Sequence, residues 1–271
     1  MLSILKMEKI SSLQNPRIKN ITKLAKNKER REQGLFIIEG ARELSLALMA
    51  DYEIDSVFIC PGLFAKTDYP DVLETIPENK IYEVTEVVFD KIAYREGSDG
   101  LLTLAKPKDH TLNNLKLSDN PFIIILEAVE KPGNLGGAIL RTADAARADA
   151  VIICDPATDL YNPNAVRSSV GCLFTVQTAV CSSQEALDFL HGKNIKSFAA
   201  ELQASQWYQD TNFTTPSAIV MGTEADGLTN FWLDNADVRI KIPMRGKIDS
   251  LNVSVSTAVI TFEAMRQRGF S

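Results

Sequence analysis

The second half of this 271-residue chain alternates apolar runs with helical patterns, and this alternation constrains the fold more than any other feature. Residues 122–126 (FIIIL) are continuously apolar, which is typical of a strand buried on both faces of a parallel sheet. Further strand-like runs lie at 151–154, 174–179, 195–200, 218–222 and 238–242, with helical patterns at about 136–147, 163–170, 183–191, 228–234 and 252–268. The alternation predicts an α/β fold, with a parallel sheet and helices on both of its faces.

The first half of the chain predicts a smaller α/β domain. Residues 16–33 begin with a proline, repeat apolar residues at helical spacing and end before Gly34, which predicts one helix. Strands are expected at 36–40, 56–60, 80–84 and 100–105, and helices at 41–50 and around 64–76. Residues 106–120 are polar and lack periodicity. We therefore expect one domain over residues 1–105, a linker over 106–120 and a second domain over 121–271.

Charge is distributed unevenly along the chain. The formal net charge is −6, which by itself argues against a nucleic-acid partner. Residues 1–33 carry nine Lys and Arg against three acids, a balance of +6, whereas the remainder holds 20 bases and 32 acids, a balance of −12. A basic segment on an acidic body indicates local phosphate contacts, although a solvated helix face gives the same pattern. The candidate RNA-binding residues are Arg17, Lys19, Lys23, Lys26, Arg30 and Arg31.

Several classes of protein are disfavoured by the composition. No stretch approaches the roughly 18 consecutive apolar residues of a membrane span, and the N-terminus lacks a signal-peptide pattern. The four cysteines show neither metal-ligand spacing nor C-x-x-C, which indicates buried thiols in a reducing cytoplasm. Only His110 and His191 are present, so a His-dependent triad or a multi-histidine metal site is hard to build. We expect a cytoplasmic protein without a bound metal.

Three segments could carry chemistry, and the first runs from Lys131 to Gly137. It follows a predicted buried strand and leads into a helix containing Arg141. Glycines at such a turn let a ligand approach the backbone, and a helix N-terminus favours anions. A nicotinamide-dependent oxidoreductase using Asp155 is an alternative, although the glycine spacing is not G-x-G-x-x-G. Arg141 could also form a surface salt bridge with Asp144 or Asp149.

The second and third segments follow later strands. Residues 221–228 place Glu224 between two glycines at a strand end, where α/β sheets bind ligands, although an ordinary turn would look similar. Residues 242–254 form a tight loop in which Ser250 is expected to cap the final helix. Apolar residues recur at helical spacing from there, so we expect that face of the helix to lie in the core. These residues are Leu251, Val255, Val259 and Phe262.

Together and in this order, the three segments resemble the SpoU (TrmH-like) branch of the SPOUT methyltransferases. That family carries an Asn-plus-Arg motif after its first strand, a Gly-x-Glu-x-x-Gly-Leu motif and a C-terminal Pro…Ser-Leu-Asn-Val-Ser-Val motif. The resemblance covers roughly residues 121–268. Residues 36–40, with the basic helix before them, are similar to the ribosomal-protein-like RNA-binding domain of many members. The resemblance implies a SPOUT domain with a C-terminal trefoil knot, assembled as a homodimer.

The resemblance also implies an RNA 2′-O-ribose methyltransferase that uses S-adenosylmethionine. The catalytic residues it implies are Arg141, Asn134, Glu224, Ser250 and Asn252. The cofactor-binding residues it implies are Gly222, Thr223, Glu224, Ile242, Met244, Ser250 and Leu251. Because a guanidinium stays protonated, we expect Arg141 to hold a phosphate and stabilise the alkoxide rather than to accept the proton. Ribosomal RNA is favoured over tRNA, since the added domain is commoner on ribosomal RNA enzymes; a non-catalytic RNA-binding protein is the remaining alternative.

One spacing departs from the family pattern. Its members usually place the Asn six residues before the Arg, whereas Asn134 and Arg141 are seven apart because of an extra glycine, Gly136 or Gly137. Either the turn absorbs the extra residue as a bulge, or Asn134 does not lie where the family's Asn does.

Overall fold

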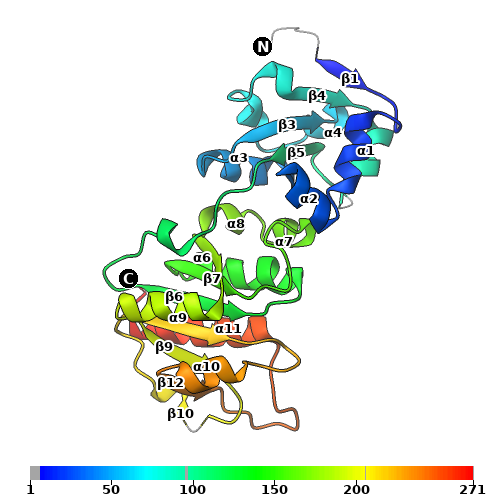
Figure 1. Cartoon of the computed structure of the whole chain (residues 1–271). Coiled ribbons are helices and arrows are strands. Elements are labelled where there is room, and N and C mark those ends of the chain that lie inside the picture. Colours follow the sequence, from blue (N-terminus) through cyan, green and yellow to red (C-terminus); the bar gives the residue numbers. More distant parts are fainter. Residues whose placement is uncertain (1–6, 95–96, 205, 271) are drawn as a thin grey trace. The chain divides into compact units, whose positions relative to one another are not determined.

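The computed structural model describes residues 7–94, 97–204 and 206–270, which form two compact units (Figure 1). Unit 1 contains the chain up to Lys108 together with Tyr161–Arg167, and unit 2 contains Asp109–Leu160 and the chain from Ser168 onward. The division at Lys108 falls inside the segment expected to be a linker. Lys6, one of the bases counted in the basic segment, lies outside the described residues.

Unit 1 is built on a five-stranded sheet with the order β1-β4-β3-β5-β2. Strands β1 (Glu8–Ile10) and β3 (Ile54–Ile59) pair in parallel with β4 (Ile81–Val84). Strand β5 (Leu101–Ala105) pairs antiparallel with both β3 and β2 (Phe36–Glu39). The α/β class expected for this half is confirmed, with β1 as an additional edge strand.

Unit 1 contains more helices than expected, and several are shorter. They are α1 (Pro16–Lys23), α2 (Asn27–Gln33), α3 (Ala41–Met49), α4 (Pro61–Phe64) and α5 (Glu86–Ile92), with 3₁₀ turns at Pro70–Leu73 and Glu78–Lys80. The single helix predicted over 16–33 is wrong, because the extended backbone of Lys26 separates α1 from α2. The helix predicted around 64–76 is also wrong; Pro70, which disfavours helix at the residue before it, lies in the middle of that range.

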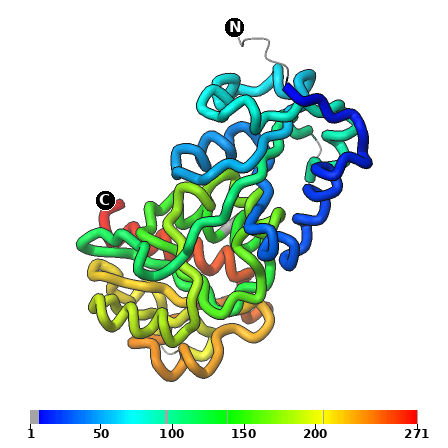
Figure 2. The backbone as a smooth tube through the Cα atoms, turned by 45° about the horizontal axis from the view of Figure 1, so that its top comes forward, coloured from blue at the N-terminus to red at the C-terminus, as the bar shows by residue number. Residues whose placement is uncertain are grey.

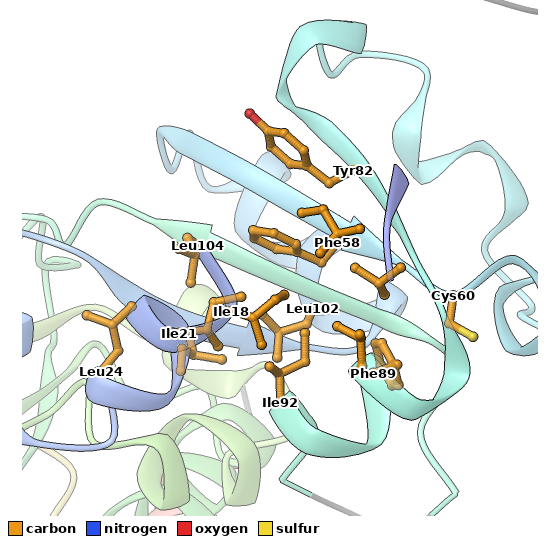
Figure 3. Packing of buried hydrophobic residues seen from close by; sticks show 14 residues of the cluster. Ile18, Ile21, Leu24, Phe58, Cys60, Tyr82, Phe89, Ile92, Leu102 and Leu104 are labelled. Atoms are coloured by element: carbon orange, nitrogen blue, oxygen red, sulfur yellow. The ribbon is translucent and has the colours of Figure 1, made fainter. Parts of the chain in front are cut away.

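The core of unit 1 joins α1 to the sheet. Ile18, Ile21 and Leu24 are at most 1% exposed and belong to one cluster with Phe58 of β3 and Phe89 of α5 (Figure 3). The apolar spacing read from the sequence therefore identified the buried side of α1. The opposite side of this helix carries the basic residues.

Unit 2 contains a seven-stranded sheet whose strands pair in parallel in the order β10-β12-β9-β11-β6-β7-β8. The strands are β6 (Phe122–Glu127), β7 (Ala150–Cys154), β8 (Thr178–Cys181), β9 (Lys196–Ala200), β10 (Gln206–Trp207), β11 (Ser217–Met221) and β12 (Val238–Lys241). The predicted parallel α/β sheet is confirmed. The strand expected at 174–179 begins only at Thr178, because Cys172–Thr175 form a short helix.

Helices connect these strands. They are α6 (Arg141–Ala145), α8 (Cys172–Thr175), α9 (Ser183–Gly192), α10 (Asn230–Asn235) and α11 (Val253–Gln267), and a π-helix, η4 (Asn134–Leu140), precedes α6. Helix α7 (Pro163–Ser168) lies in the Tyr161–Arg167 segment of unit 1, apart from its last residue. Ile123 and Ile125 of β6 pack with Leu190 of α9 and Trp232 of α10. Ile124 faces the other side of the sheet and is also fully buried. Figure 2 shows α11, in red, alongside η4 and α6, with which it is in contact.

The final helix turns a different side to the protein than expected. Thr257, Ile260 and Ala264 are fully buried, whereas Val255 and Phe262 are 48% and 42% exposed. The prediction that the apolar side of this helix is core is therefore wrong. Small and hydroxylated side chains let α11 pack closely. The buried hydroxyl of Thr257 finds a hydrogen-bond acceptor within the helix, since its Oγ1 donates to the Val253 carbonyl at 2.7 Å. The α11 stripe is left at the surface of unit 2; it consists of Leu251, Val255, Val259 and Phe262.

None of the described helices is long and apolar enough to cross a membrane.

Candidate active site

The three motif segments meet at the carboxyl edge of the sheet in unit 2. Segment 127–134 follows β6 and segment 222–228 follows β11, and these two strands are neighbours. Segment 242–252 follows β12, which is separated from β11 only by β9. Since the carboxyl ends of parallel strands lie at one edge, the order of the sheet brings the segments together where such folds bind ligands.

Glu224 contacts residues from the first and third segments. Its Oε2 atom forms an ion pair with Lys131 Nζ. Its Oε1 atom accepts hydrogen bonds from Asn134 Nδ2, at 3.0 Å, and from Asn252 Nδ2. Ser254 Oγ in turn donates to Asn134 Oδ1 at 3.3 Å. We call these five residues the Glu224 cluster.

The Glu224 carboxylate is held in its ionised form. The hydrogen bond from Lys131, and then that from Asn134, lowers its pKa below the ordinary value for glutamate. A carboxylate with a lowered pKa is a poor proton donor near neutral pH, but it accepts hydrogen bonds well. The geometry therefore gives Glu224 the task of orienting two amide side chains.

The extra residue of the first motif is taken up by the helix that follows it. Asn134–Leu140 form the π-helix η4, which continues as α6. A π turn spans one residue more than an α turn, so it accommodates a one-residue insertion within a continuous helix. A Cβ atom on Gly137 would lie 3.2 Å from Ser168 Cβ, which favours glycine there. The extra residue thus lies within a π-helical turn, and Asn134 reaches Glu224.

Arg141 is the first residue of α6 and is exposed. The surface salt bridge considered for it does not form among the described residues. Asp144 Oδ1 instead accepts from Thr175 Oγ1 at 2.5 Å, and Asp149 accepts from the backbone nitrogens of Ser118 and Phe122 at 2.7 and 2.8 Å. Within the described part of the chain, Arg141 also makes no hydrogen bond to the Glu224 cluster. Its guanidinium is therefore available to a ligand.

A cavity of about 490 Å³ lies beside the Glu224 cluster. All seven residues expected to bind the cofactor line it, namely Gly222, Thr223, Glu224, Ile242, Met244, Ser250 and Leu251. Buried Ile240, Ile260 and Leu228 contribute apolar wall. The cavity falls within the roughly 300–1,000 Å³ typical of small-molecule sites.

Gly222 lets the two ends of the 222–228 loop approach each other closely. A Cβ atom at this position would lie 2.1 Å from the Gly227 carbonyl carbon, a distance that no packing tolerates. The loop is fastened by Thr223 N, which donates to the Gly227 carbonyl at 2.9 Å, and by Gly227 N, which donates to the Thr223 carbonyl at 3.2 Å. Gly227 itself has a φ of +70°, a conformation that favours glycine. Both glycines of the motif are therefore needed to shape this wall of the cavity.

The cap of the final helix is Asn252 rather than Ser250. Ser250 Oγ donates to Asp249 Oδ1 at 3.2 Å, so the prediction that it caps α11 is wrong. Asn252 Oδ1 accepts from Ser254 N at 2.9 Å. One amide thus satisfies the helix N-terminus through its oxygen and binds Glu224 through its nitrogen.

Sequence reasoning missed two members of the Glu224 cluster. Lys131 and Ser254 lie inside the motif segments but were not selected as site residues. A lysine three positions before a candidate Asn, at the end of a buried strand, was the available signal for the ion pair. For Ser254 the local sequence gave only small-residue packing.

The basic segment divides into exposed and buried residues. Arg17, Lys19, Lys23, Lys26 and Arg31 are exposed, as an RNA-binding surface requires. Arg30 is only 4% exposed and donates through Nη1 to the carbonyls of Leu24, at 2.7 Å, and Ala25, at 2.9 Å. Its inclusion among the RNA-binding residues is wrong, because its guanidinium is buried and donates to backbone carbonyls at the turn between α1 and α2.

Two other groups were considered as ligand sites. Asp155 Oδ2 accepts from the backbone nitrogen of Ser183 at 3.0 Å and from its hydroxyl at 2.7 Å, so it fixes the start of α9 instead of facing a ribose. This removes the residue on which the oxidoreductase alternative depended. Among the described residues, no group of three or more His, Cys, Asp or Glu side chains could hold a metal ion.

Two family models match the chain. The model of the SpoU rRNA Methylase family matches residues 121–262, and that of the MRM3-like substrate binding domain matches residues 15–103. The 23S rRNA (guanosine(2553)-2'-O)-methyltransferase RlmP of Bacillus subtilis (strain 168) is 28% identical over 256 residues, covering 94% of this chain and 98% of that protein. The 23S rRNA (guanosine-2'-O-)-methyltransferase RlmB of Photobacterium profundum is 37% identical over 177 residues, covering 62% and 71%.

Solved structures match this chain over nearly its whole length. A crystal structure described as an RNA 2'-O ribose methyltransferase has a TM-score of 0.83 and 38% identity, covering 96% of this chain and 99% of that one. The AdoMet-bound rRNA methyltransferase from Sinorhizobium meliloti has a TM-score of 0.86 and 26% identity, covering 96% and 98%.

Proposed function

Because this chain belongs to the SpoU rRNA Methylase family, we propose that it transfers a methyl group from S-adenosylmethionine to a ribose 2′-hydroxyl of RNA. The observation that carries the proposal is the Glu224 cluster, which joins the first and third motifs beside a cavity lined by all seven expected cofactor residues. Unit 1 serves as the RNA-binding part, in keeping with its match to a substrate-binding domain.

The cavity suits S-adenosylmethionine in its size and in the chemistry of its walls. Ile242, Met244 and Leu251 offer apolar surface, and the 222–228 loop offers backbone groups. Glu201, which also lines the cavity, has a buried carboxylate oxygen without a hydrogen-bond partner among the described residues. A buried acceptor of this kind fits a ligand that brings a donor.

The residues of this chain then have two tasks, alignment and the handling of one proton. S-adenosylmethionine supplies an already activated sulfonium methyl. Asn134 and Asn252, fixed by Glu224, are placed to orient groups beside the cavity, and precise alignment of the reactants accelerates a transfer reaction. Arg141 holds the neighbouring phosphate and stabilises the developing alkoxide by its charge. The 2′-hydroxyl proton leaves to solvent water, because the guanidinium group donates hydrogen bonds and has no acceptor site.

We also propose that the protein works as a homodimer held by unit 2. The α11 stripe supports this, because three of its four apolar residues are between 38% and 48% exposed. Contiguous exposed apolar surface marks interaction sites. The helix carrying it contacts η4 and α6, so an interface there would lie near Arg141. Sedimentation of an active, stable monomer at micromolar concentration would contradict the proposal.

Three further parts of the proposal concern substrate, topology and location. Ribosomal RNA is the proposed substrate, supported by relatives named for 23S rRNA. The segment after β12 is proposed to form the trefoil knot; its support is that this segment and the 222–228 loop line one cavity. We propose that the protein acts in the cytoplasm, where its RNA substrate would be found.

Calorimetric titration of the full-length protein with S-adenosylmethionine and with NAD tests the cofactor directly. Binding of S-adenosylmethionine alone is expected, whereas an RNA-binding protein without activity would bind neither. Incubating the protein and labelled S-adenosylmethionine with ribosomal RNA or tRNA from a deletion strain then tests the substrate. Label entering only tRNA would refute the ribosomal assignment and favour the tRNA alternative.

A further inference from the structure

Glu201 lies between the two loops that form the cofactor cavity. The sheet order places β9 between β11 and β12, so the residue that follows β9 lies between segments 222–228 and 242–251. The backbone nitrogen of Glu201 donates to the Ile240 carbonyl at 2.9 Å, which fixes this turn against β12. Its side chain lines the cavity of about 490 Å³.

The two oxygens of this carboxylate differ in their surroundings. Oε2 accepts from the backbone nitrogen of Gln203 at 2.6 Å, which holds the side chain in one orientation. Oε1 is buried and has no hydrogen-bond partner among the described residues. A buried acceptor left without a donor is unfavourable, so its persistence at the wall of a ligand cavity indicates that the ligand supplies the donor.

The position of Glu201 along the cavity selects the part of the ligand that it contacts. At one end, the cavity shares Gly222, Glu224 and Val253 with a small pocket that also includes Asn134. At the other end, Leu202 and its neighbours also line an outer basin formed with the 241–249 segment. The reacting methyl group belongs at the Glu224 cluster. The residues around Glu201 therefore face a part of the cofactor away from the methyl group.

We propose that Glu201 is a cofactor-binding residue that accepts a hydrogen bond from a ribose hydroxyl of S-adenosylmethionine. This inference rests on the proposed function. The methionine part carries an ammonium donor, but beside it a carboxylate that Glu201 would repel, whereas the ribose presents two hydroxyl donors with no negative charge between them. An acidic side chain at the end of a parallel strand is a known solution for holding a ribose hydroxyl in α/β folds. Oε1 is an acceptor only, which suits a hydroxyl donor.

Calorimetry on the full-length protein tests the contact without relying on catalysis. The ligands are S-adenosylhomocysteine and 5′-methylthioadenosine, which keeps the ribose and adenine but lacks the amino-acid part. Glu201→Ala is expected to weaken both ligands by the same factor, about tenfold or more, the loss typical of a hydrogen bond to a charged group. Glu201→Gln keeps an acceptor and should lose less. Asp234→Asn, an exposed acid on α10, makes the same charge change as a control and should bind both ligands normally.

Deoxy analogues make the test independent of the Ala variant's folding. Removing the 2′- or the 3′-hydroxyl from 5′-methylthioadenosine should weaken binding to the wild type. For the analogue that lacks the hydroxyl bound by Glu201, the difference in affinity between wild type and Glu201→Gln should become smaller. The proposal is overturned by unchanged affinities in both Glu201 variants. A loss confined to S-adenosylhomocysteine also overturns it, because the contact would then be with the amino-acid part. If the wild type binds neither ligand, the proposed function itself has failed.

Discussion

Neighbouring arginines on α2 offer a direct test of which charges serve the fold and which serve RNA binding. Arg30 is 4% exposed and donates two hydrogen bonds to carbonyls, whereas Arg31 is exposed. A hydrogen bond to a charged group contributes about 1.5–3 kcal/mol. Because these two bonds come from one nitrogen, we expect Arg30→Gln to destabilise unit 1 by about 2–4 kcal/mol. For a domain of this size that lowers Tm by roughly 10–30 °C.

Arg31→Gln is the matched control with the opposite expectation. Its effect on stability should stay within about 0.5 kcal/mol, as is usual for surface substitutions. It should instead reduce the slope of log affinity for RNA against log salt by about 0.7–0.9, the contribution of one phosphate contact. Differential scanning calorimetry and RNA binding between 50 and 200 mM salt, roughly the range over which such contacts weaken, measure the two effects. Equal Tm values for the two variants, or a reduced salt slope in a folded Arg30→Gln protein, would refute the assignment.

Four further outcomes are expected. Gly222→Ala should abolish S-adenosylmethionine binding in calorimetry, because its Cβ would lie 2.1 Å from the Gly227 carbonyl carbon. Arg141→Ala should lose methyl transfer but keep cofactor affinity, and Arg141→Lys should retain measurable activity; a new inflection in its pH–rate profile that tracks a lysine would instead support a general base. The lowered pKa of Glu224 means that its contacts are complete above the ordinary glutamate pKa of about 4.3 and are lost as the pH falls through the lowered value. Cofactor affinity should therefore be constant near neutral pH and fall only in acid. A fall in the affinity of the wild type between about pH 6 and 8 that Glu224→Gln lacks would contradict this. Phe262→Glu should shift the dimer to monomer in analytical ultracentrifugation, since it places a charge in the α11 stripe.

The parallel sheet of unit 2 could be predicted because its strands are buried on both faces. A run such as residues 122–126 contains no polar residue, so it is recognised easily as a buried strand. The helices between the strands are recognised from apolar residues at helical spacing. Shorter elements could not be predicted, because they contain too few residues to form a pattern. The backbone break at Lys26 and the two-residue strand β10 leave no pattern long enough to detect.

Features that depend on contacts with distant parts of the chain were the least predictable. Apolar spacing located an apolar side of α11 correctly, but it could not say that Thr257 and Ser254 would face inward instead. Likewise Arg30 and Arg31 look alike in sequence, and only the turn at Leu24 decides which of them is buried. Motifs supplied the candidate site residues, but the ion pair of Glu224 with Lys131 depends on the sheet order that brings β6 beside β11, which the motifs do not contain.

The π-helix at residues 134–140 has a consequence for how this chain can change its length. In an ordinary α-helix one inserted residue rotates everything beyond it by about 100°, because each turn holds 3.6 residues. The wider turn of η4 holds one residue more than an α turn, so the extra residue between Asn134 and Arg141 rotates Arg141 much less than it would in an α-helix. Deleting Gly136 or Gly137 is therefore expected to convert the π turn into an α turn while leaving Asn134 and Arg141 on similar sides of the helix.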